Sequence, residues 1–471
     1  MTPVLKTVNA KNLHARAHEA LRLLSPRISA IIDDLHHAGA TVYLVGGAVR
    51  DLLLKKTITD ADIELHRKSP EAVQEILARH GTVEQIGASF GVLLIHGVPV
   101  DWSFPRVDSA GRKPLVTIDY MLPIDRALAR RDVTINALAL DLKTGELHDP
   151  YGGVDDLVAG VLRSPENSRF AEDPLRFYRV LQLMARFEAE PEPELTRICQ
   201  HMSVTGVAHE RIEAEFRKLL LYSRSPSRAF RWLKKIGRLK ELYPELAILA
   251  DTPQEPEWHP EGDVFEHSMQ ALDAAAHGNY HDDFHKLVIA YSALCHDMGK
   301  AVTTEKIDNR IRSHGHEIAG VKIAEKFMRK ISFNEKLIEN ILKLVRYHMS
   351  PALLINSGAK PAAYKRLAQW LSPVSISWLV DLAYADVRGR NPHSHEPLTS
   401  PVPILEQFVH AVQNARVYES PEKPILLGRD LLEYISPGPH MGKLLAHAYE
   451  IQIEENIQDK KILLERILKE H

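Results

Sequence analysis

The sequence predicts an α+β protein with a small sheet-containing head, an all-helical body and a second helical domain. A β-branched run enters a double glycine and then a helical pattern in TVYLVGGAVRDLLL, and ADIEL, GVLLIHG and VPVDWSFP are typical of further strands. From Glu172 onward amphipathic helical patterns dominate, as in EDPLRFYRVLQLMARF, ERIEAEFRKLLLY and SRAFRWLKKIGRL. Proline-rich stretches at 250–262 and 390–402 interrupt any helix and mark boundaries.

These breaks divide the chain into several parts. Apolar residues recur at three- and four-residue spacing from Leu21 to Leu35, which predicts a helix that packs against the rest of the chain. We expect an N-terminal helical extension over 1–40, a head over 41–160, a helical neck and body over 161–250, a histidine-rich helical domain over 257–390 and a C-terminal helical segment over 401–471. A chain of 471 residues is about three times the length of a typical domain, so several cores are expected.

Composition narrows the class of protein without identifying a partner. Hydrophobic residues at 45% and charged residues at 26% exclude a mainly disordered chain. Two cysteines cannot build a disulfide framework, and no stretch approaches the roughly 18 apolar residues of a membrane span, so we expect a cytoplasmic protein with no membrane partner. The net charge is -3, so any polyanion must meet a local basic surface.

The double glycine of the head is a candidate phosphate site. Gly46 and Gly47 lie between a predicted strand and a helix that carries Arg50. In such a turn bare backbone N–H groups can approach a phosphate, and an arginine can pair with it. Taken alone, a glycine pair after a strand is more often just a tight turn.

Three aspartates of the head are candidate metal ligands. Asp60 and Asp62 lie two residues apart in TDADIEL, so on a strand both carboxylates face the same side and need a cation. Hard oxygen ligands of this kind suit Mg²⁺. Asp101, on a strand that we expect beside the first, is a possible third acid. The alternatives are a solvated strand end for the first two and a buried structural acid for Asp101.

These residues carry a family resemblance. GGAVRD followed by DAD resembles the class II tRNA nucleotidyltransferases and bacterial poly(A) polymerases of the DNA polymerase beta superfamily. The second signature of that family corresponds to RRDVTINALAL at 130–140 with HDPYGGVDDL, its nucleotide-reading signature to AEDPLRFYRV at 171–180, and its neck motif to HERIEAE at 209–215. Lys55 departs from the pattern, because the family often has glycine there, and Glu64 adds an acid beside the pair.

The resemblance implies a specific set of roles. It makes Asp60 and Asp62 the Mg²⁺ ligands of a catalytic site with Asp101. Its nucleotide-binding residues are Gly46, Gly47, Arg50, Arg131, Asp132, Asp173, Arg176 and Arg179. In the family, residues at the positions of Asp173 and Arg176 present hydrogen-bonding edges to cytosine or adenine, so the protein acts as the template. The last three residues have helical spacing, and the simpler interpretation is an ion pair on a helix surface.

The histidine-rich segment predicts a second metal site. His296 and Asp297 lie in ALCHDMGK, His267 lies upstream and Asp386 downstream, and imidazoles with carboxylates suit a transition metal. The ordered set resembles the HD phosphohydrolase superfamily, and HPEGDVFEHS, HDMGKA and HGHEIAGV are similar to the C-terminal domain of multifunctional bacterial CCA-adding proteins. The resemblance implies Ni²⁺, Mn²⁺ or Co²⁺ at this HD site, with His314, His316 and His348 as further candidates. The alternative is a degenerate domain used only as a scaffold for tRNA.

The resemblances together imply a tRNA nucleotidyltransferase that adds or repairs the 3′-terminal CCA with CTP and ATP, and whose HD domain hydrolyses phosphate esters. The loop from Pro105 to Leu122 and the intact HD domain favour this activity over poly(A), CC-only or A-only addition. A different-class alternative is an HD phosphohydrolase with a non-catalytic, RNA-binding head. The densest basic set predicts the tRNA-binding surface and contains Arg217, Lys218, Arg231, Lys234, Lys235 and Arg238. The sequence leaves the oligomeric state open.

Overall fold

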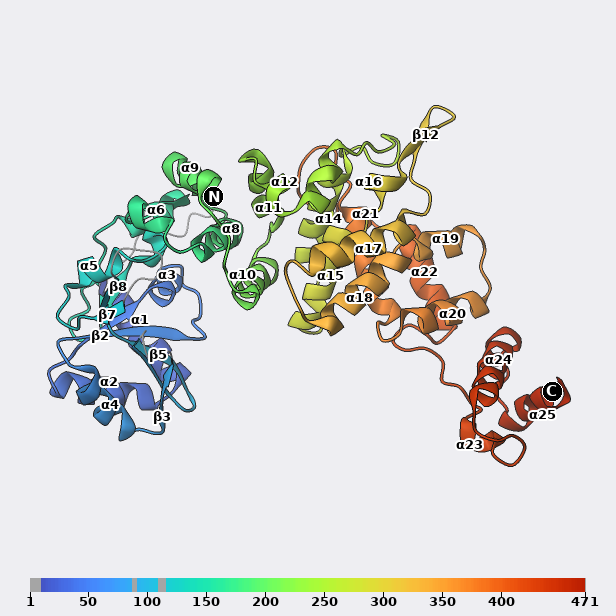
Figure 1. The fold of residues 1–471 in the computed structure, drawn as a ribbon, viewed down its shortest axis with the longest axis horizontal. Helices are drawn as coiled ribbons and strands as arrows, with labels where there is room; N and C mark the ends of the chain where they lie inside the picture. Colours follow the sequence, from blue (N-terminus) through green and yellow to red (C-terminus); the bar gives the residue numbers. More distant parts are fainter. Residues whose placement is uncertain (1–9, 87–90, 109–115, 471) are drawn as a thin grey trace. The chain divides into compact units, whose positions relative to one another are not determined.

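The computed structural model describes residues 10–86, 91–108 and 116–470 (Figure 1). Contacts divide the chain into two units, residues 1–207 and 208–471. The predicted α+β class is confirmed, with a sheet in the first unit and mainly helices in the second. The finer division of the chain into five parts stays a prediction.

The first unit is built on a seven-stranded sheet with the order β3-β4-β5-β2-β1-β8-β9. Neighbouring strands are antiparallel except β2 and β5, which are parallel and are joined by a crossover connection. The strands are β1 (Thr41–Val45), β2 (Ala61–His66), β3 (Val83–Ile86), β4 (Val92–Ile95), β5 (Val98–Ser103), β8 (Ala139–Asp141) and β9 (Leu147–His148). Because β2 is central, its residues can meet partners from both sides.

Two N-terminal helices belong to the core of this sheet. The predicted single helix is two helices, α1 (Ala10–Leu24) and α2 (Arg27–His37), because Pro26 interrupts it. Their apolar faces are buried with residues of β1, β2 and β5 in one hydrophobic cluster that includes Leu21, Ile31 and Trp102. The described part of the predicted extension therefore packs as part of the head from Leu13 onward.

Short elements complete the first unit. The helices are α3 (Gly47–Leu53), α4 (Pro70–Ala78), α5 (Ile124–Leu128), η2 (Thr134–Asn136), α6 (Gly153–Ala159), α7 (Asn167–Phe170), α8 (Leu175–Phe187) and α9 (Pro193–His201). The small strand pairs are β6 (Arg106–Asp108) with β7 (Val116–Ile118) and β10 (Val161–Leu162) with β11 (Glu190–Pro191). The region after 160 is thus not entirely helical. Residues 109–115 of the predicted Pro105–Leu122 loop lie outside the described residues.

The second unit begins with helices that lead to the histidine-rich segment. They are α10 (His209–Tyr222), α11 (Ser227–Lys235), α12 (Leu239–Leu242), α13 (Pro244–Ala247) and η3 (Ile248–Asp251). The proline-rich stretch after η3 is irregular, as predicted. The histidine-rich helices are α14 (Val264–Ala276), α15 (Asp283–Cys295), α16 (Lys300–Thr303), α17 (His316–Met328), α18 (Glu335–Tyr347), α19 (Ser350–Asn356), α20 (Pro361–Leu371), α21 (Ile376–Arg388) and α22 (Pro403–Asn414).

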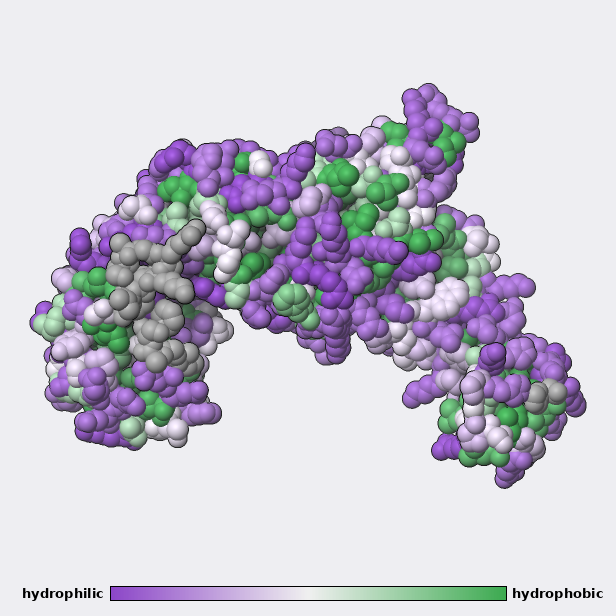
Figure 2. All heavy atoms as spheres, viewed as in Figure 1, coloured by the Kyte–Doolittle hydropathy of each residue, from purple (hydrophilic) through white to green (hydrophobic). Residues whose placement is uncertain are grey.

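A short hairpin interrupts these helices and was not expected from the sequence. It contains β12 (Glu305–Ile307) and β13 (Arg310–Arg312), and its outer surface is mainly hydrophilic (Figure 2). Asp308 and Asn309 form its tip with φ of 49° and 64°, a conformation typical of a tight type I′ hairpin turn.

The chain ends in a small helical group, α23 (Gly428–Leu431), α24 (Pro439–Glu455) and α25 (Lys460–Glu470). It has its own apolar cluster, which includes Leu431, Met441 and Leu463. Arg366 of α20 pairs with Glu450 of α24 at 2.8 Å. Among the helices that the structure describes, none is both long and apolar enough to pass through a membrane.

Candidate active sites

The turn between β1 and α3 requires glycine at Gly46. This residue has φ of +73°, and a Cβ atom there would collide with the guanidinium of Arg131 and lie 3.5 Å from Asp62 Oδ2. The turn therefore brings bare backbone next to the acidic end of β2. Gly47 opens α3, where a Cβ would lie 3.3 Å from Arg50 Nη2.

The three head aspartates lie at neighbouring positions of the sheet. Asp62 and Asp101 are direct partners in the parallel pairing of β2 with β5, so their side chains share a face. Asp60 lies immediately before β2 rather than on it, and all three residues are exposed. Desolvation and the negative charges of Asp62 and Asp60 raise the pKa of Asp101. A divalent cation would relieve this repulsion, and oxygen ligands fit Mg²⁺.

The carboxylates of the head lie at adjacent positions, but their oxygen atoms are not close enough together to form a compact group of three metal ligands. Among the described residues, groups of three histidine, cysteine or acidic side chains with ligand atoms within 4.8 Å of one another occur only in the second unit. Arg131 Nη1 lies 4.0 Å from Asp62 Oδ2, so a cation already faces the acidic group. Glu64, in contrast, is buried and accepts a 2.9 Å hydrogen bond from His66, so it does not extend the acidic group.

The resemblance implies that Arg50 binds the nucleotide, and the structure shows which partners its side chain has within the head. Its side chain is buried, donates to Asp51 and to Asn136 Oδ1, and lies over the ring of Phe187 at 4.4 Å. Burial lowers the pKa of Arg50, and Asp51 opposes that change. These contacts give Arg50 a role in joining α3 to η2 and to the end of α8.

Asp132, which the resemblance also implies as a nucleotide-binding residue, is buried and held by side chains of the head. It accepts a 2.6 Å bond from Arg179 Nε and bonds of 3.0 and 3.2 Å from Asn136. Although burial alone would raise the pKa of Asp132, Arg179 and Asn136 lower it to about 2. The pair of Asp132 and Arg179 therefore ties the segment after α5 to α8.

The residues that the resemblance implies for reading the nucleotide lie at the start of α8. Asp173 precedes the helix and so lies outside the predicted helical spacing, and its Oδ1 accepts from the backbone N–H of Leu175, the first residue of α8, at 3.0 Å. Arg176 donates to the carbonyl oxygens of Arg169 at 2.7 Å and Arg130 at 2.6 Å. These bonds fix the orientation of a half-buried guanidinium, which a base-reading residue requires.

The HD site joins four residues from three parts of the second unit. His267 comes from the first turn of α14, His296 and Asp297 follow α15, and Asp386 lies in the last turn of α21. The Nε2 atom of His267 lies 3.2 Å from Nε2 of His296, 3.2 Å from Asp386 Oδ1 and 3.6 Å from Asp297 Oδ2. Both histidines and Asp297 are buried. The structure thus brings together all four predicted ligands.

Asp297 faces a second pair of histidines with its other oxygen. Its Oδ1 lies 3.2 Å from His316 Nε2 and 3.8 Å from His348 Nε2, and these two nitrogens are 3.1 Å apart. Two groups of candidate ligands therefore share one carboxylate. His314 lines the nearby pocket but is not part of either group.

The ring nitrogens that face away from the two groups are all occupied. The Nδ1 atoms of His296, His316 and His348 contact the carbonyls of Ala293, Ser313 and Val345 at 2.7–2.8 Å. Nδ1 of His267 lies 2.7 Å from Glu261 Oε1, on a buried side chain. If each Nδ1 carries the proton, each Nε2 keeps its lone pair for a metal, which is the usual arrangement of histidine ligands. Sequence reasoning did not assign a role to Glu261, although it lies within the quoted HPEGDVFEHS motif.

Charges around the site favour ionised acids, whereas the imidazoles divide: the carboxylates outweigh burial and raise the pKa of His267 and His316, and burial lowers the pKa of His296 and His348. Burial raises the pKa of Asp297, but Lys300, 2.7 Å from its Oδ2, holds it well below the usual range. Arg390, 2.6 Å from Asp386 Oδ1, does the same for that acid. Burial and the neighbouring histidines lower the pKa of His348 to about 3. Imidazoles and ionised carboxylates in this proportion fit a transition metal.

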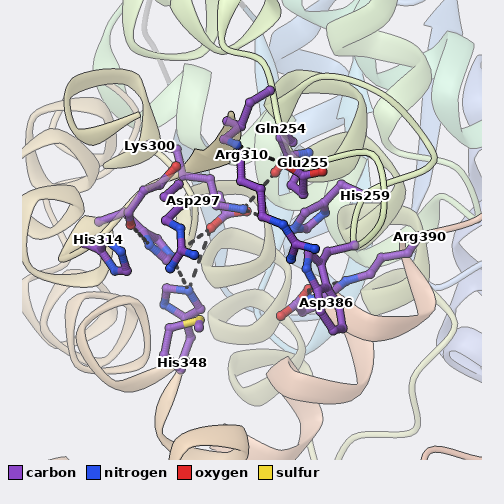
Figure 3. Close-up of a pocket in the computed structure, with 16 residues that line it drawn as sticks. Gln254, Glu255, His259, Asp297, Lys300, Arg310, His314, His348, Asp386 and Arg390 are labelled. Carbon is purple, nitrogen blue, oxygen red and sulfur yellow. Dashed lines mark hydrogen bonds and ion pairs between the residues drawn. The ribbon is translucent and has the colours of Figure 1, made fainter. Parts of the chain in front are cut away.

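A pocket of about 540 Å³ opens over these ligands. Figure 3 shows Asp297 in its centre, His348 below, Asp386 with Arg390 on one side and His314 on the other. Lys300, Arg310, Arg312 and Arg390 add positive charge to its lining. A pocket with this lining can receive a phosphate ester.

The predicted RNA-binding residues differ in their freedom to bind phosphate. Arg217 pairs with Asp283 at 3.4 Å, Lys218 with Glu215 at 3.1 Å, and Lys234 lies 4.0 Å from Asp263. Lys235 is exposed, with no ion-pair partner among the described residues. Two members of the wider basic set are engaged inside the protein: Arg231 pairs with Glu266 and Asp273, and the side chain of Arg238 is 6% exposed. The basic surface is therefore smaller than expected.

Comparisons with known proteins follow the same division. Residues 42–163 match the Poly A polymerase head domain and residues 264–370 match the HD domain, a match that ends before Asp386. The chain is 31% identical over 362 residues to the multifunctional CCA protein of Pasteurella multocida, covering 74% of this chain and 84% of that protein. It is 32% identical over 390 residues to that of Nitrosospira multiformis, covering 79% and 88%.

Solved structures show the same fold at lower identity. The CCA-adding enzyme of Bacillus stearothermophilus in complex with CTP aligns with a TM-score of 0.64 and 20% identity, over 94% of this chain and 97% of that one. A CCA-adding enzyme of Thermotoga maritima complexed with tRNA aligns with a TM-score of 0.54 and 19% identity, over 99% and 97%.

Fold and sites together define a nucleotidyltransferase head joined to an HD domain, two classes of domain that depend on divalent metal ions. The sequence matches are more specific. The chain belongs to the family of multifunctional CCA proteins.

Proposed function

We propose that this protein adds or repairs the 3′-terminal CCA of tRNA from CTP and ATP without a nucleic-acid template. The observation that carries the proposal is the pairing of Asp62 with Asp101 beside the Gly46 turn, in the same unit as a fixed Arg176. Membership of the CCA protein family supports this activity. We also propose a cytoplasmic location, which two buried free cysteines and a tRNA substrate support.

Asp60, Asp62 and Asp101 would hold Mg²⁺ in the head. A bound metal would lower the pKa of the RNA 3′-hydroxyl and would neutralise charge on the leaving pyrophosphate. Arg131, 4.0 Å from Asp62, contributes a fixed positive charge next to the triphosphate. Gly46 and Gly47 leave the backbone accessible at this point.

The test is end synthesis by the full chain. Purified protein is incubated with tRNA that lacks its 3′ end and with each labelled nucleotide, and the product ends are sequenced. We expect C, C and A to be added in order, and Asp62→Ala to abolish addition while the protein stays folded, because the carboxylate is exposed. Poly(A) tails, or C alone, would identify the corresponding alternative. Substantial addition by Asp62→Ala would rule out Asp62 as a required metal ligand, whereas no addition by the parent would favour the non-catalytic head.

Base choice tests the role of Arg176. Its guanidinium is held by two backbone carbonyls, so we expect it to offer its remaining donors in one orientation. Arg176→Ala should slow addition and relax the preference for CTP and ATP over UTP and GTP, because hydrogen-bonding sites discriminate strongly. Arg197→Ala, which removes an exposed helix-surface arginine paired with Glu194, is the matched control. Unchanged preference would make Arg176 a structural residue.

We also propose that the HD domain hydrolyses phosphate esters with a transition metal, Ni²⁺, Mn²⁺ or Co²⁺, held by His267, His296, Asp297 and Asp386. The specific observation is the convergence of their ligand atoms within 3.2–3.6 Å of His267 Nε2. A divalent ion there would activate water and polarise the ester. His316 and His348 would hold a second ion next to Asp297. Metal-stripped protein should regain hydrolysis of phosphomonoesters or 2′,3′-cyclic nucleotides with these ions. If the parent protein hydrolyses neither substrate with any of the three metal ions, the domain is better interpreted as a scaffold for tRNA.

For tRNA binding we propose a basic surface around Lys235 and Lys234, with weaker contributions from Arg217 and Lys218. Phosphate contacts release counterions, so the affinity should fall steeply with salt. Lys234→Glu with Lys235→Glu should flatten that dependence by about two phosphate contacts in a filter-binding titration. An affinity insensitive both to salt and to the double change would place the binding surface elsewhere.

A further inference from the structure

Two histidines of α1 lie outside both candidate active sites. His14 and His18 are four residues apart, so their rings lie on the same face of the helix. That face meets the turn between β8 and β9, where a Cβ atom at Gly145 would lie 3.0 Å from Cγ of His14. The ring of His14 therefore packs directly on the backbone of the turn, and both histidines are half-buried.

Three atoms that carry lone pairs meet at this contact. Nε2 of His14 lies 3.0 Å and Nε2 of His18 lies 2.9 Å from the carbonyl oxygen of Leu142, and the two nitrogens are 3.1 Å apart. A neutral imidazole carries one proton, on either ring nitrogen. If both Nε2 atoms carry it, two N–H groups crowd against one oxygen. If one does not, its lone pair faces the lone pairs of the oxygen, so each arrangement leaves a repulsive contact.

A metal ion bound between the three atoms would remove each of these repulsions. Histidine nitrogens bind Zn²⁺ at about 2.0–2.1 Å, so two ligand atoms of one ion lie about 3 Å apart. The three atoms of this contact have that spacing. Imidazole ligands suit Zn²⁺, Ni²⁺ or Cu²⁺, whereas Mg²⁺ prefers oxygen ligands. The contact therefore has the spacing and the donor types of a transition-metal site.

The charges around this contact do not oppose a cation. Asp141, which precedes the carbonyl of Leu142, is buried and acts on the nearby His36 with a negative charge. Burial lowers the pKa of His36, so that ring stays neutral at neutral pH, and its Nε2 has no hydrogen-bond partner among the described residues. Lys143 is the cation of the same turn and is exposed to solvent, which screens its charge.

We propose that His14, His18 and the carbonyl oxygen of Leu142 form a structural site for Zn²⁺ or a similar transition-metal ion. The ion would fasten α1 to the turn between β8 and β9, whose ligand lies 124 positions from His18 along the chain. The inference uses no residue of the head site or the HD site, so it stands independently of both proposed activities.

The test measures hydrogen exchange of α1 in the metal-stripped full-length protein while Zn²⁺ is added. A local measurement is needed because the HD site also offers ligands for such an ion. Exchange of the amides over residues 13–24 should slow by about tenfold when Zn²⁺ reaches ten times the dissociation constant of the site, because the ion binds only the closed form. Mg²⁺ at the same concentration should have no effect. A parent protein whose α1 exchange does not respond to Zn²⁺ would overturn the inference.

A double substitution separates metal binding from hydrogen bonding. His14→Gln with His18→Gln keeps side-chain N–H donors for the Leu142 carbonyl but removes both imidazoles. Without metal, its α1 exchange should be close to that of the parent; with Zn²⁺ it should not change, and equilibrium dialysis should find one Zn²⁺ fewer per chain. His96→Ala, which removes an exposed histidine of the head, is the control and should respond as the parent does.

A double variant that responds to Zn²⁺ as the parent does would also overturn the inference. If the double variant loses α1 protection without metal, the single variant His18→Gln replaces it in the same titration. A weakened Zn²⁺ response in that variant supports the site, and an unchanged response overturns it.

Discussion

The two candidate sites differ in how much of each is built before a substrate arrives. In the head, Asp60, Asp62 and Asp101 are exposed, adjacent and repelling. In the HD site the histidines and Asp297 are buried, and backbone carbonyls or Glu261 hold the far side of each ring. The head site therefore depends on ions and a triphosphate to complete it, whereas the HD site is preorganised by its own core.

We expect the largest effect from a double substitution that removes ligands of the HD site and leaves the head unchanged. His296→Ala with Asp297→Ala should lower ester hydrolysis at least about a thousandfold, because several kcal/mol of metal stabilisation are lost. tRNA end synthesis should stay within about twofold. The same variant should be destabilised by roughly 3 kcal/mol or more, since Lys300 loses its buried partner, whereas Asp62→Ala should not be. A variant that is folded by circular dichroism and hydrolyses at the parent rate would rule out this site.

A smaller effect should follow from changing the support of His267. Glu261→Gln keeps the shape but removes the charge that orients the ring, so affinity for Ni²⁺ or Mn²⁺ should fall about 10- to 100-fold by calorimetric titration. Glu339→Gln, an exposed change on α18, is the control and should bind as the parent does. If Glu261→Gln binds the metal as tightly as the parent does, the charge of Glu261 is not needed to orient the His267 ring.

The pH dependence of the head provides an intermediate effect. The pKa of Asp132 is about 2 in the folded protein and 3.8 when unfolded, so its stabilising contribution is present above pH 4 and lost as pH falls through 2. The contribution is about 2 kcal/mol. Asp132→Asn should destabilise the head by about that amount at pH 7 and lose less stability on acidification. Hydrogen exchange of β1 and β8 amides reports the head alone. Asp33→Asn, an exposed change on α2, should behave like the parent.

The smallest effect concerns Lys55, which has φ of 56° after α3. Glycine adopts this conformation without strain, so Lys55→Gly should stabilise the head by about 0.5–1 kcal/mol and leave both activities unchanged. Lys143→Gly, at an exposed position without positive φ, should not stabilise it. The same exchange measurement compares the two. Loss of stability in Lys55→Gly would show that the lysine side chain matters more than the backbone.

Local patterns determined much of this protein. Apolar periodicity and glycine and proline breaks predicted the α+β class, and the expected placement of the strand of Asp101 next to that of Asp62 is confirmed. The order of the HD motifs indicated four ligands, which the structure brings together. These predictions are confirmed because the periodicity of apolar residues indicates which face of a strand or helix is buried, and because the order of motifs along the chain is a property of the sequence itself.

Only the tertiary structure decided which polar groups meet. The resemblance implies that Arg50 and Asp132 bind the nucleotide, but only the structure shows that Arg50 contacts Asn136, 86 positions away, and that Asp132 pairs with Arg179. Arg231 looked available to RNA but pairs with Glu266, while Glu261 had no assigned role until His267 was seen beside it. A buried charge needs a partner, and sequence distance does not show which partner packing supplies. The two-sided environment of Asp297 has the same origin, because its flanking histidines come from separate helices that meet only in the folded core.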